Sequence, residues 1–160
     1  KESLFAHGGY AITFGYGAVI GIITLIAFMI TPWKEGLFDI NAINSWFEAN
    51  PNKLEEAQSM AFCVLSFSEL FHMLGMTDVK HSFVKVFKDP NKMLWISFFL
   101  GMGLQLFVIE VPGVNTFFKV YQLNDEPMDW LWVFLLAMVP LLVHEIVVFA
   151  LFIKRKISAK

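Results

Sequence analysis

The chain has 160 residues, of which 57% are apolar and only 16% are charged, and its mean hydropathy is +0.61. Soluble domains contain roughly 45–50% apolar and about 25% charged residues, so this composition excludes an ordinary water-soluble globule. The 18 Phe, 5 Trp and 8 Met residues exclude a disordered chain, because these side chains need burial. A formal net charge of −2 argues against nucleic-acid binding, and a single cysteine excludes an internal disulfide.

Four apolar stretches are long enough to cross a membrane. A bilayer core about 30 Å thick needs about 20 mostly apolar residues per helix, and the stretches cover residues 10–30, 57–76, 93–109 and 130–153. None of them alternates with the period of two that a membrane β-barrel requires. The sequence therefore predicts an all-α membrane protein: one domain over residues 1–160, with four transmembrane helices in an antiparallel bundle.

The distribution of basic residues predicts the orientation of these spans. The N-terminal end, the connection over residues 77–92 and the tail from Lys154 hold nine Lys and Arg, whereas the connections 31–56 and 110–129 hold three. Basic residues favour the cytoplasmic side, so we expect both termini and the middle connection in the cytoplasm. Four tryptophans then fall near the outer interface and Trp95 near the inner one, as an aromatic belt would place them.

The middle connection also has a distinctive composition. From His81 to Lys88, apolar and aromatic residues alternate with basic ones. This pattern suits a short segment on an anionic membrane surface. It suits equally well a contact with a cytoplasmic domain of the same protein, and the residues do not decide between the two.

Signatures of soluble catalysis are absent from the sequence. There is no phosphate-binding loop, no nucleophile elbow and no zinc-protease motif. The connections between spans have at most 26 residues, which is too few for a nucleotide-binding domain. We expect no catalytic residue and no cofactor site in these 160 residues alone.

Ionisable residues inside the spans are the candidates for function, because each costs roughly 2.5–3.5 kcal/mol in a membrane. Glu69 lies near the middle of the second span, and Ser66 and His72 lie three residues to either side, on the same helical face. Such a carboxylate can bind a cation, as hard cations prefer oxygen ligands, or carry a proton. A protonated Glu69 that only hydrogen-bonds a neighbouring helix explains the residue equally well.

Two other spans carry residues with predicted structural roles. In the fourth span, Pro140 should kink the helix. Its neighbours His144 and Glu145 project about 100° apart, which favours a structural or lipid-interface role for the pair over transport. In the first span, Gly17 and Gly21 have the spacing that permits close helix packing.

The order of residues resembles the last four membrane helices, the seventh to the tenth, of type II P-type cation-transporting ATPases, above all calcium pumps of the sarco/endoplasmic-reticulum type and their bacterial relatives. Three stretches carry the resemblance. They are Ala57–Leu65 followed by Ser68–His72, Ser82–Lys85 through Pro90–Trp95, and Phe118–Val120 with Asp129–Trp130 and Val139–Ile146. The Glu2–Phe5 start and the glycine-rich first span extend it nearly end to end.

The resemblance implies the C-terminal membrane part of an ATP-driven cation pump, most closely a calcium pump. The Lys-rich, Arg-poor composition and the short tail favour a bacterial plasma membrane. The resemblance also implies that Glu69 stands where the family has an oxygen ligand on its eighth helix, although His72 stands where the reticulum pumps have an amide. ATP, Mg²⁺ and the transported cation would be bound by the full-length parent, and the partners would be the bilayer, the remaining membrane helices and the cytoplasmic domains. The opening at Lys1 without Met agrees with a piece of a longer chain.

Two rival functions remain on the sequence alone. One is a free-standing four-helix membrane scaffold or partner subunit without catalytic activity. The other is a small proton- or cation-coupled transporter that uses the ionisable residues of the second and fourth spans, Glu69, His72, His144 and Glu145.

Overall fold

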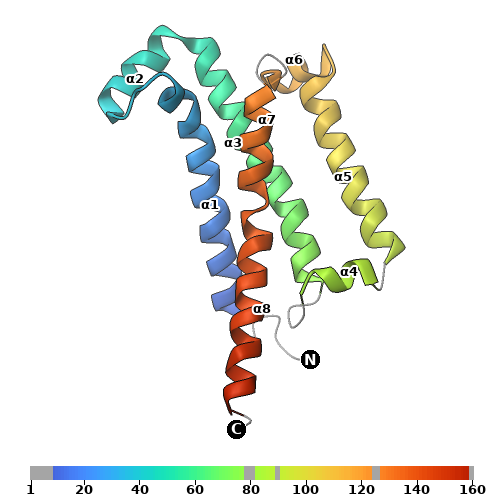
Figure 1. The fold of residues 1–160 in the computed structure, drawn as a ribbon. Coiled ribbons are helices and arrows are strands. Elements are labelled where there is room, and N and C mark those ends of the chain that lie inside the picture. Colours follow the sequence, from blue (N-terminus) through green and yellow to red (C-terminus); the bar gives the residue numbers. More distant parts are fainter. Residues whose placement is uncertain (1–8, 78–81, 89–90, 124–126, 159–160) are drawn as a thin grey trace.

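The computed structural model describes residues 9–77, 82–88, 91–123 and 127–158, and within these ranges the regular elements are helices (Figure 1). The opening residues 1–8, together with His81 and Pro90, lie outside the described residues. The helices are α1 (Gly9–Lys34), α2 (Ile40–Ala49), α3 (Pro51–Met76), α4 (Val84–Lys88), α5 (Lys92–Glu110), α6 (Val114–Phe118), α7 (Pro127–Ala137) and α8 (Val139–Ser158).

Among the described residues, four helical stretches are long and apolar enough to cross a membrane. They are Ile12–Lys34, Pro51–Met76, Lys92–Glu110 and Pro127–Lys154, the last formed by α7 and α8 together. The predicted all-α class with four membrane-length helices is confirmed. The helices extend beyond the apolar stretches marked in the sequence, because backbone hydrogen bonding continues through polar residues at the membrane surface.

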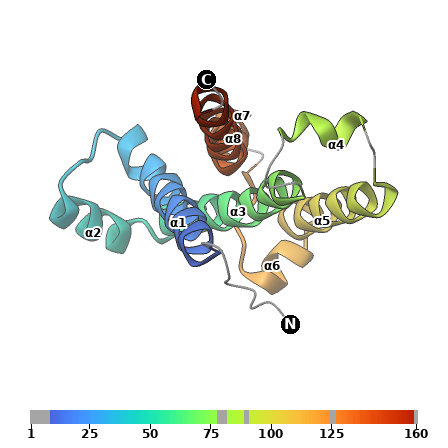
Figure 2. The same ribbon diagram turned by 90° about the horizontal axis from the view of Figure 1, so that it is seen from below.

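Helix α3 lies at the centre of the arrangement. Seen along the helices, α1, α3 and α5 form a row, and α7 and α8 pack beside α3 and α1 (Figure 2). The buried residues of the main core come from α1, α3, α5 and α7 and include Leu123 before α7, and Val139 of α8 packs against them. Its fully buried helical members, from α1, α3, α5 and α7, are Ala27, Met60, Cys63, Val64, Phe67, Ile109, Val133 and Ala137.

The connection between the first two spans contains the amphipathic helix α2, which the sequence reasoning did not predict. The Asp39 carboxylate caps this helix by accepting a hydrogen bond from the Asn41 backbone N–H. Ile43 and Phe47 form its buried side and pack in one cluster with Phe28. Helix α3 then starts at Pro51, a residue that suits the first helical position because it lacks a backbone N–H.

The fourth span is interrupted next to Pro140. Helix α7 ends at Ala137, Met138 forms a turn, and α8 begins at Val139. A proline ring removes one backbone hydrogen bond and crowds the preceding turn, which accounts for a break at this point.

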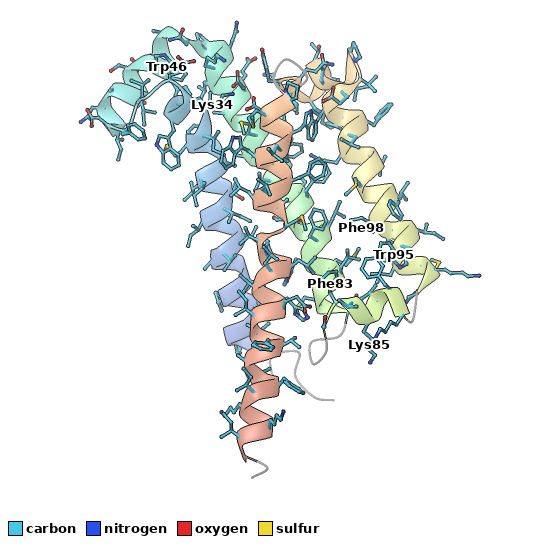
Figure 3. All side chains as sticks on the ribbon, viewed as in Figure 1. Lys34, Trp46, Phe83, Lys85, Trp95 and Phe98 are labelled. Carbon is cyan, nitrogen blue, oxygen red and sulfur yellow. The ribbon has the colours of Figure 1, made fainter. Side chains whose placement is uncertain are left out.

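The two ends of the molecule carry different side chains. Lys34 and Trp46 lie at the end where α2 and α6 are found, whereas Phe83, Lys85 and Trp95 lie at the end where α4 is found (Figure 3). Helix α4 buries Val86 and exposes Val84 and Phe87. An aromatic contact joins α4 to α5, because the ring of Phe87 packs on that of Trp95 with the ring centroids 5.1 Å apart.

Candidate functional site

Helix α3 has one buried face and one uncovered stripe. The uncovered α3 stripe consists of four exposed residues, each about one helical turn from the next, namely Gln58, Phe62, Leu65 and Glu69. The opposite face is packed against the neighbouring helices, with Phe67 fully buried against the rings of Trp130 and Phe134. The polar mid-span residue of this helix therefore lies on the side that the rest of the described chain leaves open.

The predicted trio around Glu69 is spread across the edge of this stripe. Glu69 is exposed, whereas Ser66 and His72 are half-buried. The His72 ring packs against Tyr16 of α1, with ring centroids 4.4 Å apart, and its buried Nδ1 atom has no hydrogen-bond partner among the described residues. Within the same residues, no hydrogen bond or ion pair engages Glu69. Its carboxylate is therefore available to a group outside the described chain.

The described residues do not form a complete metal site by themselves. No group of three or more His, Cys, Asp or Glu side chains gathers in a way that could hold a metal ion, as far as the described ranges extend. Ca²⁺ takes six to eight oxygen ligands, so Glu69 can supply only part of such a site.

The adjacent residues His144 and Glu145 both face protein. His144 is buried, and it packs so closely on α3 that a methyl group on the Gly75 Cα would lie 3.1 Å from the His144 Cγ. Glu145 Oε1 accepts a hydrogen bond of 2.6 Å from the backbone N–H of Phe83, the residue before α4. These contacts hold α8 against α3 and fix the start of α4, and neither side chain meets Glu69 in a described contact.

Close glycine packing occurs at positions that the sequence reasoning did not identify. Gly17 and Gly21 are exposed, and a Cβ added to either one meets nothing within 4 Å. By contrast, a Cβ at Gly101 of α5 would meet the Leu70 Cδ2 of α3 at 2.8 Å. The close contact between α3 and α8 therefore depends on Gly75, and that between α3 and α5 depends on Gly101. Neither glycine belongs to a GxxxG motif that would have predicted its role.

An ion pair between the end of α1 and the start of α7 was also missed. Lys34 Nζ, at the end of α1, lies 2.8 Å from Asp129 Oδ1, at the start of α7. The Asp129 side chain is only 4% exposed, and that of Lys34 is 27% exposed. The available signal was their shared side of the membrane in the predicted topology, but nothing in the sequence pairs two residues 95 positions apart.

These features define a helical integral membrane domain whose central helix presents an ionisable side chain on an uncovered face. Residues 1–150 match the family model described as the C-terminus of cation transporting ATPases, and the chain belongs to this family. It is 37% identical over 152 residues to Calcium-transporting ATPase 1 of Bacillus cereus (strain ATCC 10987 / NRS 248). That alignment covers 92% of this chain but 16% of the relative. No solved structure matches the chain.

The comparisons confirm the resemblance to the C-terminal membrane region of a P-type calcium pump. They do not favour a free-standing scaffold, because family membership links the four spans to a larger transport protein.

Proposed function

We propose that this chain forms the C-terminal membrane region of an ATP-driven calcium pump of a bacterial plasma membrane, where it supports the helices that move the ion. Three observations support this proposal: the family match over residues 1–150, the bacterial relative whose name specifies calcium transport, and four membrane-length helices packed around α3. The partners in this function are the bilayer, the remaining membrane helices and the cytoplasmic domains of the same pump.

Glu69 supplies one oxygen ligand to the transported Ca²⁺, or carries a proton in exchange for it. The observation that carries this role is an exposed mid-span carboxylate without a partner among the described residues. An ionisable side chain facing lipid would cost several kcal/mol, so such groups face protein or water. The uncovered α3 stripe then packs against other membrane helices of the pump, which provide the remaining oxygens. Ser66 and His72 flank the carboxylate from the edge of the stripe.

ATP and Mg²⁺ act in other parts of the pump. The sequence of this chain has no phosphate-binding loop, and its connections of at most 26 residues are too short to form a nucleotide pocket. In the transport cycle, this chain holds the ion-moving helices of the pump in place and presents the Glu69 oxygen.

The proposed orientation places both termini and α4 on the cytoplasmic side and α2 on the outer side. The nine-to-three distribution of Lys and Arg supports it, as does the separation of Trp46 from Lys85 at opposite ends of the molecule (Figure 3). A membrane-impermeant thiol reagent should label Ser45→Cys in intact cells and Lys88→Cys only after permeabilisation. The reverse pattern would invert the topology.

The ligand role is tested by Glu69→Gln in the full-length pump. Glu55→Gln is the matched control, because it makes the same chemical change at an exposed position of the same helix, near the membrane surface. We expect Glu69→Gln to weaken apparent calcium affinity by about tenfold or more, because a charged oxygen ligand is lost, and Glu55→Gln to leave it unchanged. Calcium-dependent ATPase activity and equilibrium ⁴⁵Ca²⁺ binding measure this.

The outcomes separate the two parts of the proposal. Unchanged calcium affinity and stoichiometry in Glu69→Gln would refute the ligand role while leaving the pump assignment intact. A full-length protein without calcium-dependent ATPase activity would refute the pump assignment itself.

A further inference from the structure

A shallow groove lies between α1 and α7. It is at the end of the bundle that carries Lys34, which is labelled in Figure 3. Its volume is about 310 Å³. It is lined by Ile26, Ile30, Trp33 and Lys34 from α1 and by Trp132 and Leu136 from α7. It lies on the face of these two helices and does not include Glu69, so it is separate from the proposed ion ligand.

The polarity of the lining residues changes along the groove. Ile26, Ile30 and Leu136 make one part purely hydrocarbon, whereas Lys34 brings an ammonium group to the end of α1. Trp33 and Trp132, which are 41% and 42% exposed, contribute indole rings from the two facing helices. Indoles concentrate where hydrocarbon meets headgroups, because they combine an apolar ring with one N–H donor. The groove thus has the polarity of one bilayer leaflet, from acyl chain to headgroup.

The size of the groove distinguishes between occupants. Its volume lies at the lower end of the range of about 300–1,000 Å³ that is typical of small-molecule sites. A transmembrane helix, about 10–12 Å across with its side chains, would lie over such a groove without entering it. A single flexible hydrocarbon chain can enter. Both walls belong to membrane-spanning helices, so phospholipid is the apolar chain that reaches them at high concentration.

We propose that this groove binds one phospholipid, with an acyl chain between Ile26 and Leu136 and the lipid phosphate beside Lys34. The Lys34 side chain lines the groove and keeps 27% of its surface exposed while it pairs with Asp129. A bound lipid fills the space between α1 and α7 directly beside the ion pair that joins them. It therefore stabilises the same helix contact.

A photoreactive lipid tests this site in the full-length protein. The probe is phosphatidylethanolamine with a diazirine in its acyl chain, mixed into phosphatidylethanolamine vesicles that contain the protein. After illumination, mass spectrometry maps the labelled peptides. We expect labelling of residues 26–34 and 132–136.

A variant pair makes the test specific. Ile26→Trp fills the groove, whereas Leu25→Trp adds the same side chain at the adjacent position, which is 65% exposed and outside the lining. We expect Ile26→Trp to reduce labelling of these peptides by about tenfold, because the indole occupies the space of the acyl chain, and Leu25→Trp to leave it unchanged. If Ile26→Trp does not fold, Trp132→Ala, which removes one wall, should reduce labelling in the same way.

Two results would overturn the proposal. One is equal labelling of the groove peptides in the wild type and in the folded groove variants. The other is the absence of lipid labelling there, together with a stoichiometric copurified membrane polypeptide that crosslinks to Trp132, which would assign the surface to a protein partner.

Discussion

Helices α3 and α5 both span the membrane, but they occupy opposite environments. In α3, 44% of the membrane-spanning window is buried inside the protein, against 11% in α5. Helix α3 carries buried polar side chains, including Ser59 and Ser68, and the mid-span Glu69. Helix α5 exposes large apolar side chains along much of its length, such as Phe99, Leu100 and Leu104.

This difference shows how a bilayer changes the rule for choosing a core. In water, the most apolar helix would be buried most deeply. In lipid, apolar side chains lose little by facing the solvent, because acyl chains are as apolar as leucine. Polar groups, by contrast, must find protein partners. The most polar of the four spans therefore becomes the central one, and its one uncovered stripe is the place where a further partner is needed.

Phe67 and Phe99 give the largest contrast between the two helices. Phe67→Ala should destabilise the protein by roughly 2–3 kcal/mol, below the about 3–5 kcal/mol of water-soluble cores, because mainly the packing cost remains in lipid. Phe99→Ala, at a side chain that is 62% exposed, should change stability by less than about 0.5 kcal/mol. Denaturant unfolding of the full-length protein in detergent measures both. Equal losses would mean that α3 is not the packed helix.

The Lys34–Asp129 pair extends the comparison to the link between α1 and α7. Lys34→Met leaves the buried Asp129 carboxylate without this partner, and we expect a loss of about 1–2 kcal/mol, reduced from the value for a fully buried pair because Lys34 is partly exposed. A double-mutant cycle with Asp129→Asn should show coupling of the two positions. Strictly additive losses would argue that the pair contributes nothing.

Of the three contacts tested for stability, the smallest loss should follow from removing the Glu145 contact, which ties the residue before α4 to α8. Glu145→Ala removes the acceptor of the Phe83 N–H and should loosen α4 by about 1 kcal/mol, the usual value for a lost helix cap. Hydrogen exchange of residues 84–88 should then accelerate by roughly fivefold, while exchange in α3 stays slow. Glu145→Gln, which keeps an oxygen acceptor, serves as the control. Faster exchange in α3 as well would show that α4 and α3 open together.

Much of the fold was predictable because it depends on local properties of the chain. Apolar length located the four spans, and the rarity of ionisable residues in membranes made Glu69 a candidate site residue. The helix α2 was predictable in principle, since Asp39 is a good cap and Ile43 and Phe47 are spaced for one face. A search for membrane-length apolar stretches does not find it, because its 10 residues are too few to cross a bilayer.

Contacts between helices were less predictable, because they depend on which faces meet. Gly17 and Gly21 carry the familiar small-residue spacing but face open space, whereas the isolated Gly75 and Gly101 lie against His144 and Leu70. A spacing motif shows only that a helix can be approached closely. Whether a neighbour is present on that face depends on the packing of the other helices.

The sequence by itself determined that this protein belongs in a bilayer and how many times it can cross, and it made one mid-span carboxylate, Glu69, the candidate for a function. Each of these follows from the transfer of side chains between water and lipid, a property of short stretches of chain. Only the tertiary structure decided that α3 is central, that Glu69 lies on its uncovered stripe, and that a groove opens between α1 and α7. Those features depend on how each helix is oriented about its own axis and on how helices far apart in sequence pack together.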